Sequence, residues 1–282
     1  MDFFLTLLVD GVLSGAIYAL IALAFVLVYR ASRMMNFALG EWMMVGALLA
    51  GSGAHGLQLG TLGGLAFAAL GTLALAAAFC LVVVRRLADG PAISAIMATL
   101  GLGMVLRGGA ALLASTTAMA VPLGIAIDKT TAAAIAVLCT AAIAAFYRWS
   151  RTGVALRAIA DDRQAAMAMG IDVDRHLLVV WLMTGLVALI AGLLWAAVIG
   201  GGFGVVLVGL KVFPIVILGG VDSIAGTLVA AVAVGVLESL GAGYLDRPLG
   251  AGFGGIAPYL ALLAMLVLRP HGLFGRARVE RV

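Results

Sequence analysis

The stretch LLVVWLMTGLVALIAGLLWAAVI, residues 177–199, contains neither a charged side chain nor a proline. A helix needs about 20 mainly apolar residues to cross the hydrocarbon core of a bilayer, so this stretch predicts a transmembrane helix. The apolar residues are continuous and do not alternate with polar ones, which argues against a strand of a transmembrane β-barrel.

The whole chain shares this apolar character. Of its 282 residues, 65% are hydrophobic and 11% are charged, whereas an ordinary soluble domain is about 25% charged. The 38 glycines fit the same class, because small residues let helices pack closely within lipid. The predicted fold is therefore all-α, a polytopic transmembrane helix bundle that forms one domain over residues 1–282.

The apolar runs predict nine candidate spans, of which the second and seventh are short enough to be half-spans. We therefore expect eight or nine membrane segments. Pro214 is expected to break or kink the seventh segment. The N-terminus, MDFFLTLLVDGVLSG, carries an acid and no basic region, and it predicts a first span rather than a cleaved signal peptide. The approximate bounds are 9–29, 36–54, 61–84, 93–114, 130–147, 177–199, 205–219, 223–241 and 252–268.

Basic residues concentrate in alternate loops. Most of them lie in four places: 30–33, 85–86, 148–176 and the tail RPHGLFGRARVERV, whereas the loop GSGAHGLQLG has none. Loops rich in Lys and Arg face the cytoplasm, so we expect the N-terminus outside and the C-terminus in the cytoplasm. The net charge of +4 then results from basic residues in the loops that we expect in the cytoplasm. No basic face with interleaved aromatic residues indicates nucleic-acid binding.

The loop RTGVALRAIADDRQAAMAMGIDVDR, residues 151–175, interrupts the apolar pattern with four basic and four acidic residues. Its apolar residues are near helical spacing, which predicts a short amphipathic helix at the membrane surface. The segment QAAMAMG, residues 164–170, predicts a short helix with a flat small-residue face, ended by a glycine with positive φ. Such an element is suited to insertion into a groove on another protein. The alternative is a solvated linker between spans.

Four segments of the chain resemble the branched-chain amino-acid permease family of ABC importers. QAAMAMG is similar to the EAA-x3-G loop through which such permeases contact their ATPases, with Gln164 in place of Glu. NFALGEW, residues 36–42, resembles the family's N-F-A-x-G-E stretch. ILGGVDSIAGTLVAA, residues 217–231, resembles L-G-G-x-G-S-x-x-G, with Asp222 where Gly is common, and RPHGLFG, residues 269–275, resembles the R-P-x-G-L-F/L-G ending.

The resemblance implies a multi-pass permease of a bacterial plasma (inner) membrane. It implies a second related permease as partner in a heterodimer, two cytoplasmic ATPases and an extracytoplasmic substrate-binding protein. The chain lacks the G-x-x-x-x-G-K-[ST] phosphate loop, so we expect no enzyme activity, no bound cofactor, and ATP and Mg on the ATPases alone. Leucine, isoleucine and valine are the implied substrates, with other amino acids, urea, amides and small carboxylates left open. The residues implied in ATPase coupling, within the loop 148–176, are Arg157, Asp161, Gln164, Ala165, Ala166 and Gly170.

Candidates for the substrate path come from two segments of the sequence that share a pattern. MMNFALGEWMMVGALLAG, residues 34–51, and VILGGVDSIAGTLVAAVAVG, residues 216–235, both place Gly and an acid ahead of a small-residue run, and short Gly-interrupted segments in two halves indicate a transport path. The alternative is that these residues pack or cap helices. The candidates are Asn36, Gly40, Glu41, Gly219, Gly220, Asp222 and Ser223.

Two basic residues, Arg107 and Lys211, lie inside otherwise apolar runs. Each is expected to pair with an acid across the bundle, Glu41 and Glu238 being possible partners, or to extend toward an interface. Glu41 has Arg30 and Arg33 as alternative partners, and Glu238 is expected near a span end. Few ionisable residues are therefore available for ion coupling, which disfavours a self-sufficient secondary transporter or channel.

The spacing of the histidines and cysteines in the sequence does not indicate a metal site or a disulfide. His55, His176 and His271 fall in different loops, and the two cysteines lie in separate apolar runs. We expect no metal site and no disulfide framework. The sequence also contains no G-x-S-x-G elbow and no H-E-x-x-H helix. It therefore lacks the catalytic motifs that a membrane hydrolase would need.

Overall fold

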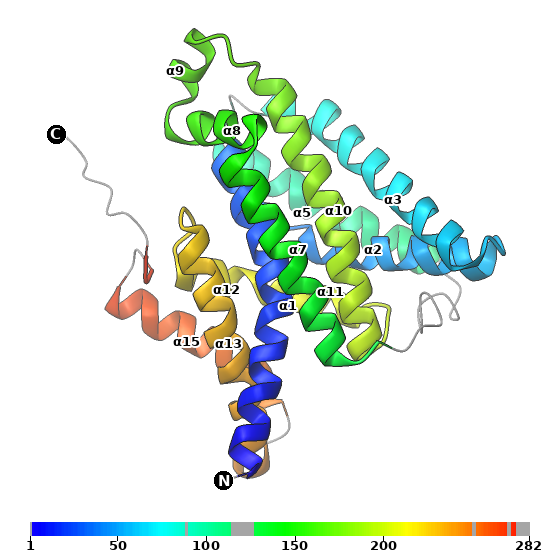
Figure 1. Ribbon diagram of the computed structural model, residues 1–282, viewed down its shortest axis with the longest axis vertical. Helices are drawn as coiled ribbons and strands as arrows, with labels where there is room; N and C mark the ends of the chain where they lie inside the picture. The colour runs from blue at the N-terminus through cyan, green and yellow to red at the C-terminus, as the bar shows by residue number, and fades with distance from the viewer. Residues whose placement is uncertain (1, 88–89, 114–126, 250–251, 270–271, 275–282) are drawn as a thin grey trace.

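All the regular structure that we can describe is helical. A computed structural model describes residues 2–87, 90–113, 127–249, 252–269 and 272–274 (Figure 1). The helices are α1 Asp2–Ser32, α2 Leu39–Gly51, η1 Ser52–Gly56, α3 Gly60–Phe79, η2 Cys80–Val84, α4 Arg85–Leu87, α5 Ala92–Leu113, α7 Lys129–Trp149, α8 Arg151–Asp161, α9 Arg163–Ala168, α10 Val173–Ile199, α11 Gly204–Leu210, α12 Val212–Gly219, α13 Ile224–Tyr244, α14 Asp246–Leu249 and α15 Phe253–Leu268.

Six helical segments are long and apolar enough to cross a membrane, and two further apolar helices are shorter. The chain is thus a polytopic membrane bundle. The candidate at 36–54 corresponds to the 13-residue α2 continued by the five-residue η1, so it is shorter than the six long segments. The long segments are Asp2–Ser32, Gly60–Leu87, Ile93–Leu112, Lys129–Trp149, Val173–Ile199 and Ile224–Tyr244, and the shorter ones are Gly204–Gly219 and Phe253–Leu268.

The first helix forms the centre of the bundle. From Ile17 to Val28 every residue of α1 is buried, and α1 packs against α7, α10, α12 and α13 (Figure 1). A helix that is apolar on all sides is expected at such a place, because no face of it needs to reach water. The α5 span is the opposite case, with only 22% of its residues buried within the chain.

The seventh predicted segment is broken, as expected, but not at the proline. The structure divides it into α11 and α12 on either side of Lys211. Pro214 lies in the first turn of α12, where a backbone N–H has no intrahelical acceptor and its loss is tolerated. The proline therefore begins the second half of the segment and the lysine marks the break.

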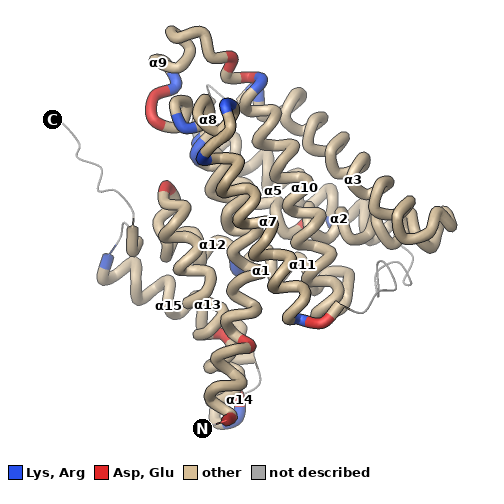
Figure 2. Tube along the Cα trace, viewed as in Figure 1, with Lys and Arg blue, Asp and Glu red and all other residues tan. Residues whose placement is uncertain are grey.

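Basic residues gather at the end of the bundle that carries α8 and α9, and the N-terminus lies at the opposite end (Figures 1 and 2). Arg30, Arg33 and Arg157 are held there by contacts with neighbouring elements. Arg85 also belongs to this end, because it donates to the carbonyl of Asp174 at 3.3 Å. The charged loop thus lies at the basic end of the molecule.

Candidate functional site

Two helices replace the single amphipathic helix expected in the charged loop. α8 begins at Arg151 after the N-cap Ser150, whose Oγ accepts from the N–H of Gly153 at 2.9 Å. It buries Leu156 in the main core and Ile159 against α9 and the start of α10. Arg157 donates to the carbonyl of Tyr147 and lies over that ring at 5.7 Å. α8 is therefore fastened to the end of α7 through Arg157.

The second helix, α9, has well-formed caps at both ends. Asp162 Oδ1 accepts from the N–H groups of Gln164 and Ala165 at 2.9 and 3.0 Å. At the other end Gly170 has φ of 81°, and the N–H groups of Gly170 and Ile171 donate to the carbonyls of Met167 and Ala166. This pair of bonds is the Schellman motif. The prediction of a short helix ended by a positive-φ glycine is confirmed.

One side of α9 is exposed. Ala166 is buried, whereas Gln164 and Ala165 are exposed, and Met167 and Met169 have exposed fractions of 48% and 82%. α9 stands at the tip of the α8–α9 unit (Figure 1). The caps therefore hold a short, rigid helix that presents small and flexible apolar side chains outward, which suits docking on another protein.

The predicted path residues at the start of α2 form a polar site inside the bundle. Asn36 is buried, and its Oδ1 accepts from the N–H of Ala38 at 3.1 Å. Its Nδ2 has no partner among the described residues. Glu41 lies in the first turn of α2 and binds Arg107 Nη2 at 2.5 Å. The pairing of Arg107 with Glu41 is confirmed, and Arg30 and Arg33 are not its partners.

This ion pair is asymmetrically exposed. The side chain of Glu41 is 9% exposed, whereas that of Arg107 is 51% exposed. A charged side chain in an apolar span is costly when it faces lipid. The face of α5 that carries Arg107 is therefore suited to contact water or protein rather than lipid.

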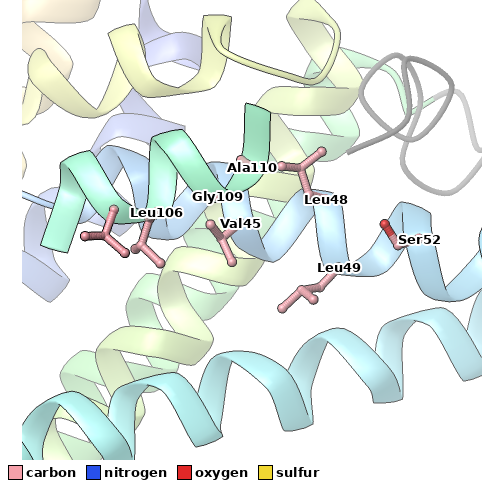
Figure 3. A pocket seen from close by; sticks show the side chains of 8 residues that line it. Val45, Leu48, Leu49, Ser52, Leu106, Gly109 and Ala110 are labelled. Atoms are coloured by element: carbon pink, nitrogen blue, oxygen red, sulfur yellow. The ribbon is translucent and has the colours of Figure 1, made fainter. Parts of the chain in front are cut away.

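An apolar cavity of about 320 Å³ lies between α2 and α5, lined on α5 by residues on both sides of Arg107 in the sequence. Figure 3 shows Val45 on α2 beside Leu106 on α5, with Leu48 and Leu49 further along α2. Gly109 and Ala110 also line it, and the Ser52 hydroxyl is among its few polar groups. A charged pair beside an apolar cavity fits a solute that has a charged head and an aliphatic side chain.

Two glycines bring α2 and α11 into close contact. A Cβ built on Gly209 would lie 2.2 Å from the Cα of Gly40, and one built on Gly40 would lie 2.7 Å from the carbonyl oxygen of Val206. No side chain fits at such distances. The predicted path residue Gly40 thus has a packing role that ties the two short helices together.

The two segments with the shared pattern, 34–51 and 216–235, are arranged differently in the structure. Glu41 is buried within α2, whereas Asp222 is exposed in the turn before α13. Ser223 Oγ accepts from the N–H of Gly226 at 3.0 Å and caps α13, while Gly219 and Gly220 are buried. The turn lies beside Arg33, whose Nη1 binds Asp222 Oδ1 at 3.2 Å. The segments 34–51 and 216–235 are therefore not structurally equivalent.

Lys211 also has an acid as its partner. Its Nζ pairs with Glu238 Oε1, and Tyr18 Oη donates to Glu238 Oε2 at 2.8 Å. The pairing of Lys211 with Glu238 is confirmed, and Glu238 lies in α13 six residues before the last residue of that helix, Tyr244. At the N-terminal end of the bundle, Asp10 pairs with Lys129 in the same way. The sequence did not predict this pair.

Comparisons with known proteins agree with this arrangement. A sequence model described as "Branched-chain amino acid transport system / permease component" matches residues 7–268. The chain is 28% identical to the high-affinity branched-chain amino acid transport system permease protein LivH of Escherichia coli (strain K12) over 311 residues, covering 99% of this chain and 98% of that protein. It is also 28% identical to BraD, a permease protein of the same description from Pseudomonas aeruginosa, over 306 residues with the same coverage.

A solved structure shares the fold. The match is to PsaBC from Streptococcus pneumoniae in complex with Fab, with a TM-score of 0.51 and 14% sequence identity, over 92% of this chain and 89% of that chain. At this identity the likeness concerns the architecture of the helices alone.

Proposed function

Because this chain belongs to the family of permease components of branched-chain amino acid transport systems, we propose that it is the membrane subunit of an ABC importer for branched-chain or other amino acids. As a transport component of this family it is not an enzyme. ATP and Mg bind to separate ATPase subunits, two per complex, and the chain itself holds no cofactor. A second related permease and an extracytoplasmic binding protein complete the importer.

The observation that carries the proposal is the α8–α9 unit. Its outer helix is capped at both ends and keeps Gln164, Ala165 and Gly170 exposed, as a docking element for an ATPase requires. Because both ends of the helix are capped, we expect it to pass the movement of a bound ATPase to α8. α8 in turn is fastened to the bundle through Arg157. Asp161, exposed at the end of α8, completes the coupling set.

The distribution of charge supports an orientation. Arginines gather at the α8–α9 end (Figure 2), and loops rich in Lys and Arg remain in the cytoplasm. The loop 148–176 then faces the cytoplasm and the N-terminus lies outside a bacterial plasma membrane. The basic tail 275–282, assigned to the cytoplasm with the C-terminus, lies outside the described residues. This orientation places the coupling unit where ATP is available.

The proposed substrate path runs along α2 and α5. Arg107 and Glu41 offer opposite charges to the carboxylate and ammonium groups of an amino acid, and the adjoining cavity offers apolar surface to its side chain. Because α5 is mostly uncovered within the chain, the second permease is expected to close the path on that side. Asn36, whose buried Nδ2 has no hydrogen-bond partner in the described part of the chain, belongs to the same region. Urea, other amides and small carboxylates stay alternatives.

Adding charge to the exposed face of α9 tests ATPase docking. We expect Ala165→Arg, at an exposed position, to abolish co-purification of the ATPase subunits from native membranes in mild detergent. Gly170→Arg should act the same way, since a side chain is strained at φ of 81°. The chain and the second permease should still co-purify, which affinity purification with mass spectrometry measures.

The matched control is Gln58→Arg, which adds the same charge at an exposed position between η1 and α3 and should leave the ATPases bound. Retention of ATPases by both loop variants would contradict the docking role of α9. A wild-type chain that purifies alone and moves amino acids without ATP would instead support the secondary-transporter alternative.

A further inference from the structure

Arg33 has a backbone conformation that normally favours glycine. It follows the last residue of α1 and has φ of 57°. Its N–H donates to the carbonyl of Tyr29 at 2.7 Å, which is the left-handed form of a helix C-cap. A side chain at such a position is strained. The strained backbone places the Arg33 side chain where it can make two hydrogen bonds to other parts of the chain.

The guanidinium of Arg33 joins two parts of the chain. Nη2 donates to the carbonyl of Ala160 at 2.9 Å, and Nη1 donates to Asp222 Oδ1 at 3.2 Å. Ala160 lies in the last turn of α8, where carbonyls lack intrahelical donors. Asp162, two residues later, caps α9. One side chain therefore connects the α8–α9 junction to the turn between α12 and α13.

The turn on the other side of this contact is itself firmly held. The N–H of Leu273 donates to the carbonyl of Leu218 at 2.8 Å, and Ser223 caps α13. α12 continues through Lys211 into α11, which meets α2 at Gly40. A displacement of this turn would therefore be passed to the short helices that border the proposed path.

We propose that Arg33 is a positioning residue that transmits the movement of α8 and α9 to the α12–α13 turn. This inference rests on the proposed function, and it adds the residue that links the ATPase-docking unit α8–α9 to the helices beside the proposed substrate path. It also gives a physical partner to Asp222, which departs from the family pattern.

The ion pair is suited to a moving contact. The side chains of Arg33 and Asp222 are 53% and 47% exposed, so the pair contributes little to stability. A cavity of about 170 Å³ between the end of α1 and the end of α8, lined in part by Arg30 and Asp161, leaves the guanidinium room to shift. A weak contact in an open space can form and break during a transport cycle.

The test uses the complete importer in liposomes, with leucine as the probe. Arg33→Gly accepts φ of 57° and removes both side-chain hydrogen bonds, to Asp222 and to the carbonyl of Ala160. We expect the ATPases to remain bound and the melting temperature to be unchanged or slightly raised, because strain is relieved. Leucine transported per ATP hydrolysed should fall about fivefold, in the range seen when a coupling contact is lost.

Two further variants separate transmission from a simple loss of charge. Asp222→Ala should lower the same ratio, and Arg33→Gly with Asp222→Ala should be no worse than Arg33→Gly alone, because residues in one contact are not additive. Arg86→Ala removes an exposed arginine from α4 and should leave the ratio unchanged.

An unchanged transport ratio in Arg33→Gly would overturn the inference, as would costs of the two substitutions that simply add. Loss of the ATPases from Arg33→Gly would place Arg33 in the docking surface and would also overturn it. Wild-type uptake that needs neither ATP nor the ATPases would overturn the proposed function itself, so the two failures are distinguishable.

Discussion

Gly209→Ala is expected to destabilise the protein strongly, although it adds a single methyl group to a helix. Its Cβ would lie 2.2 Å from the Cα of Gly40, so α11 and α2 would have to separate. Overpacking of this kind costs roughly 3 kcal/mol, and both helices border the proposed path. We expect a lower melting temperature in detergent and loss of transport.

The control for this variant is Gly255→Ala in α15, where a Cβ meets no atom within 4 Å. In a helix, alanine is favoured over glycine by about 1 kcal/mol, so the control should be neutral or stabilising. The opposite signs of the two effects would identify close helix contact as the cause. A Gly209→Ala protein as stable and active as the wild type would refute the crossing of α2 and α11.

The second large effect is expected from Glu41→Ala. The substitution leaves Arg107 without its carboxylate partner, and an arginine that has lost its partner within an apolar span is unfavourable. We expect poor recovery of the folded protein, measured by size-exclusion chromatography in detergent, and no transport.

A double variant distinguishes folding from function at this site. Glu41→Leu with Arg107→Leu removes both charges, and replacing both members of an ion pair leaves no buried Glu41 carboxylate without its partner. We expect the double variant to fold and to bind its partners, yet to transport leucine poorly because the polar groups of the path are gone. Full transport by the double variant would show that the pair is only structural.

The parts of the structure that depend on local sequence could be predicted. Long apolar runs predict the spans because a bilayer requires a certain helix length. The small residues and Gly170 predict α9 and its end because φ of 81° is a local property of glycine.

Contacts between distant segments were predicted less completely. The cost of isolated charges in lipid predicts that Arg107 pairs with an acid or extends toward an interface, and it leaves Arg30 and Arg33 as alternative partners of Glu41. The contact of Arg33 with Asp222 joins residues 189 positions apart, and no periodicity carries that information. The break at Lys211 likewise depends on how α11 packs against α2. Pro214, the local signal, marks a helix start instead.

ATP-dependent uptake tests the central claim most directly. We would place this chain in liposomes with its second permease and ATPases, enclose ATP, and add labelled leucine with the binding protein outside. The account predicts uptake that requires ATP and disappears when the ATPases are omitted or the chain carries Ala165→Arg. Equal uptake by the chain alone, without ATP, would contradict it.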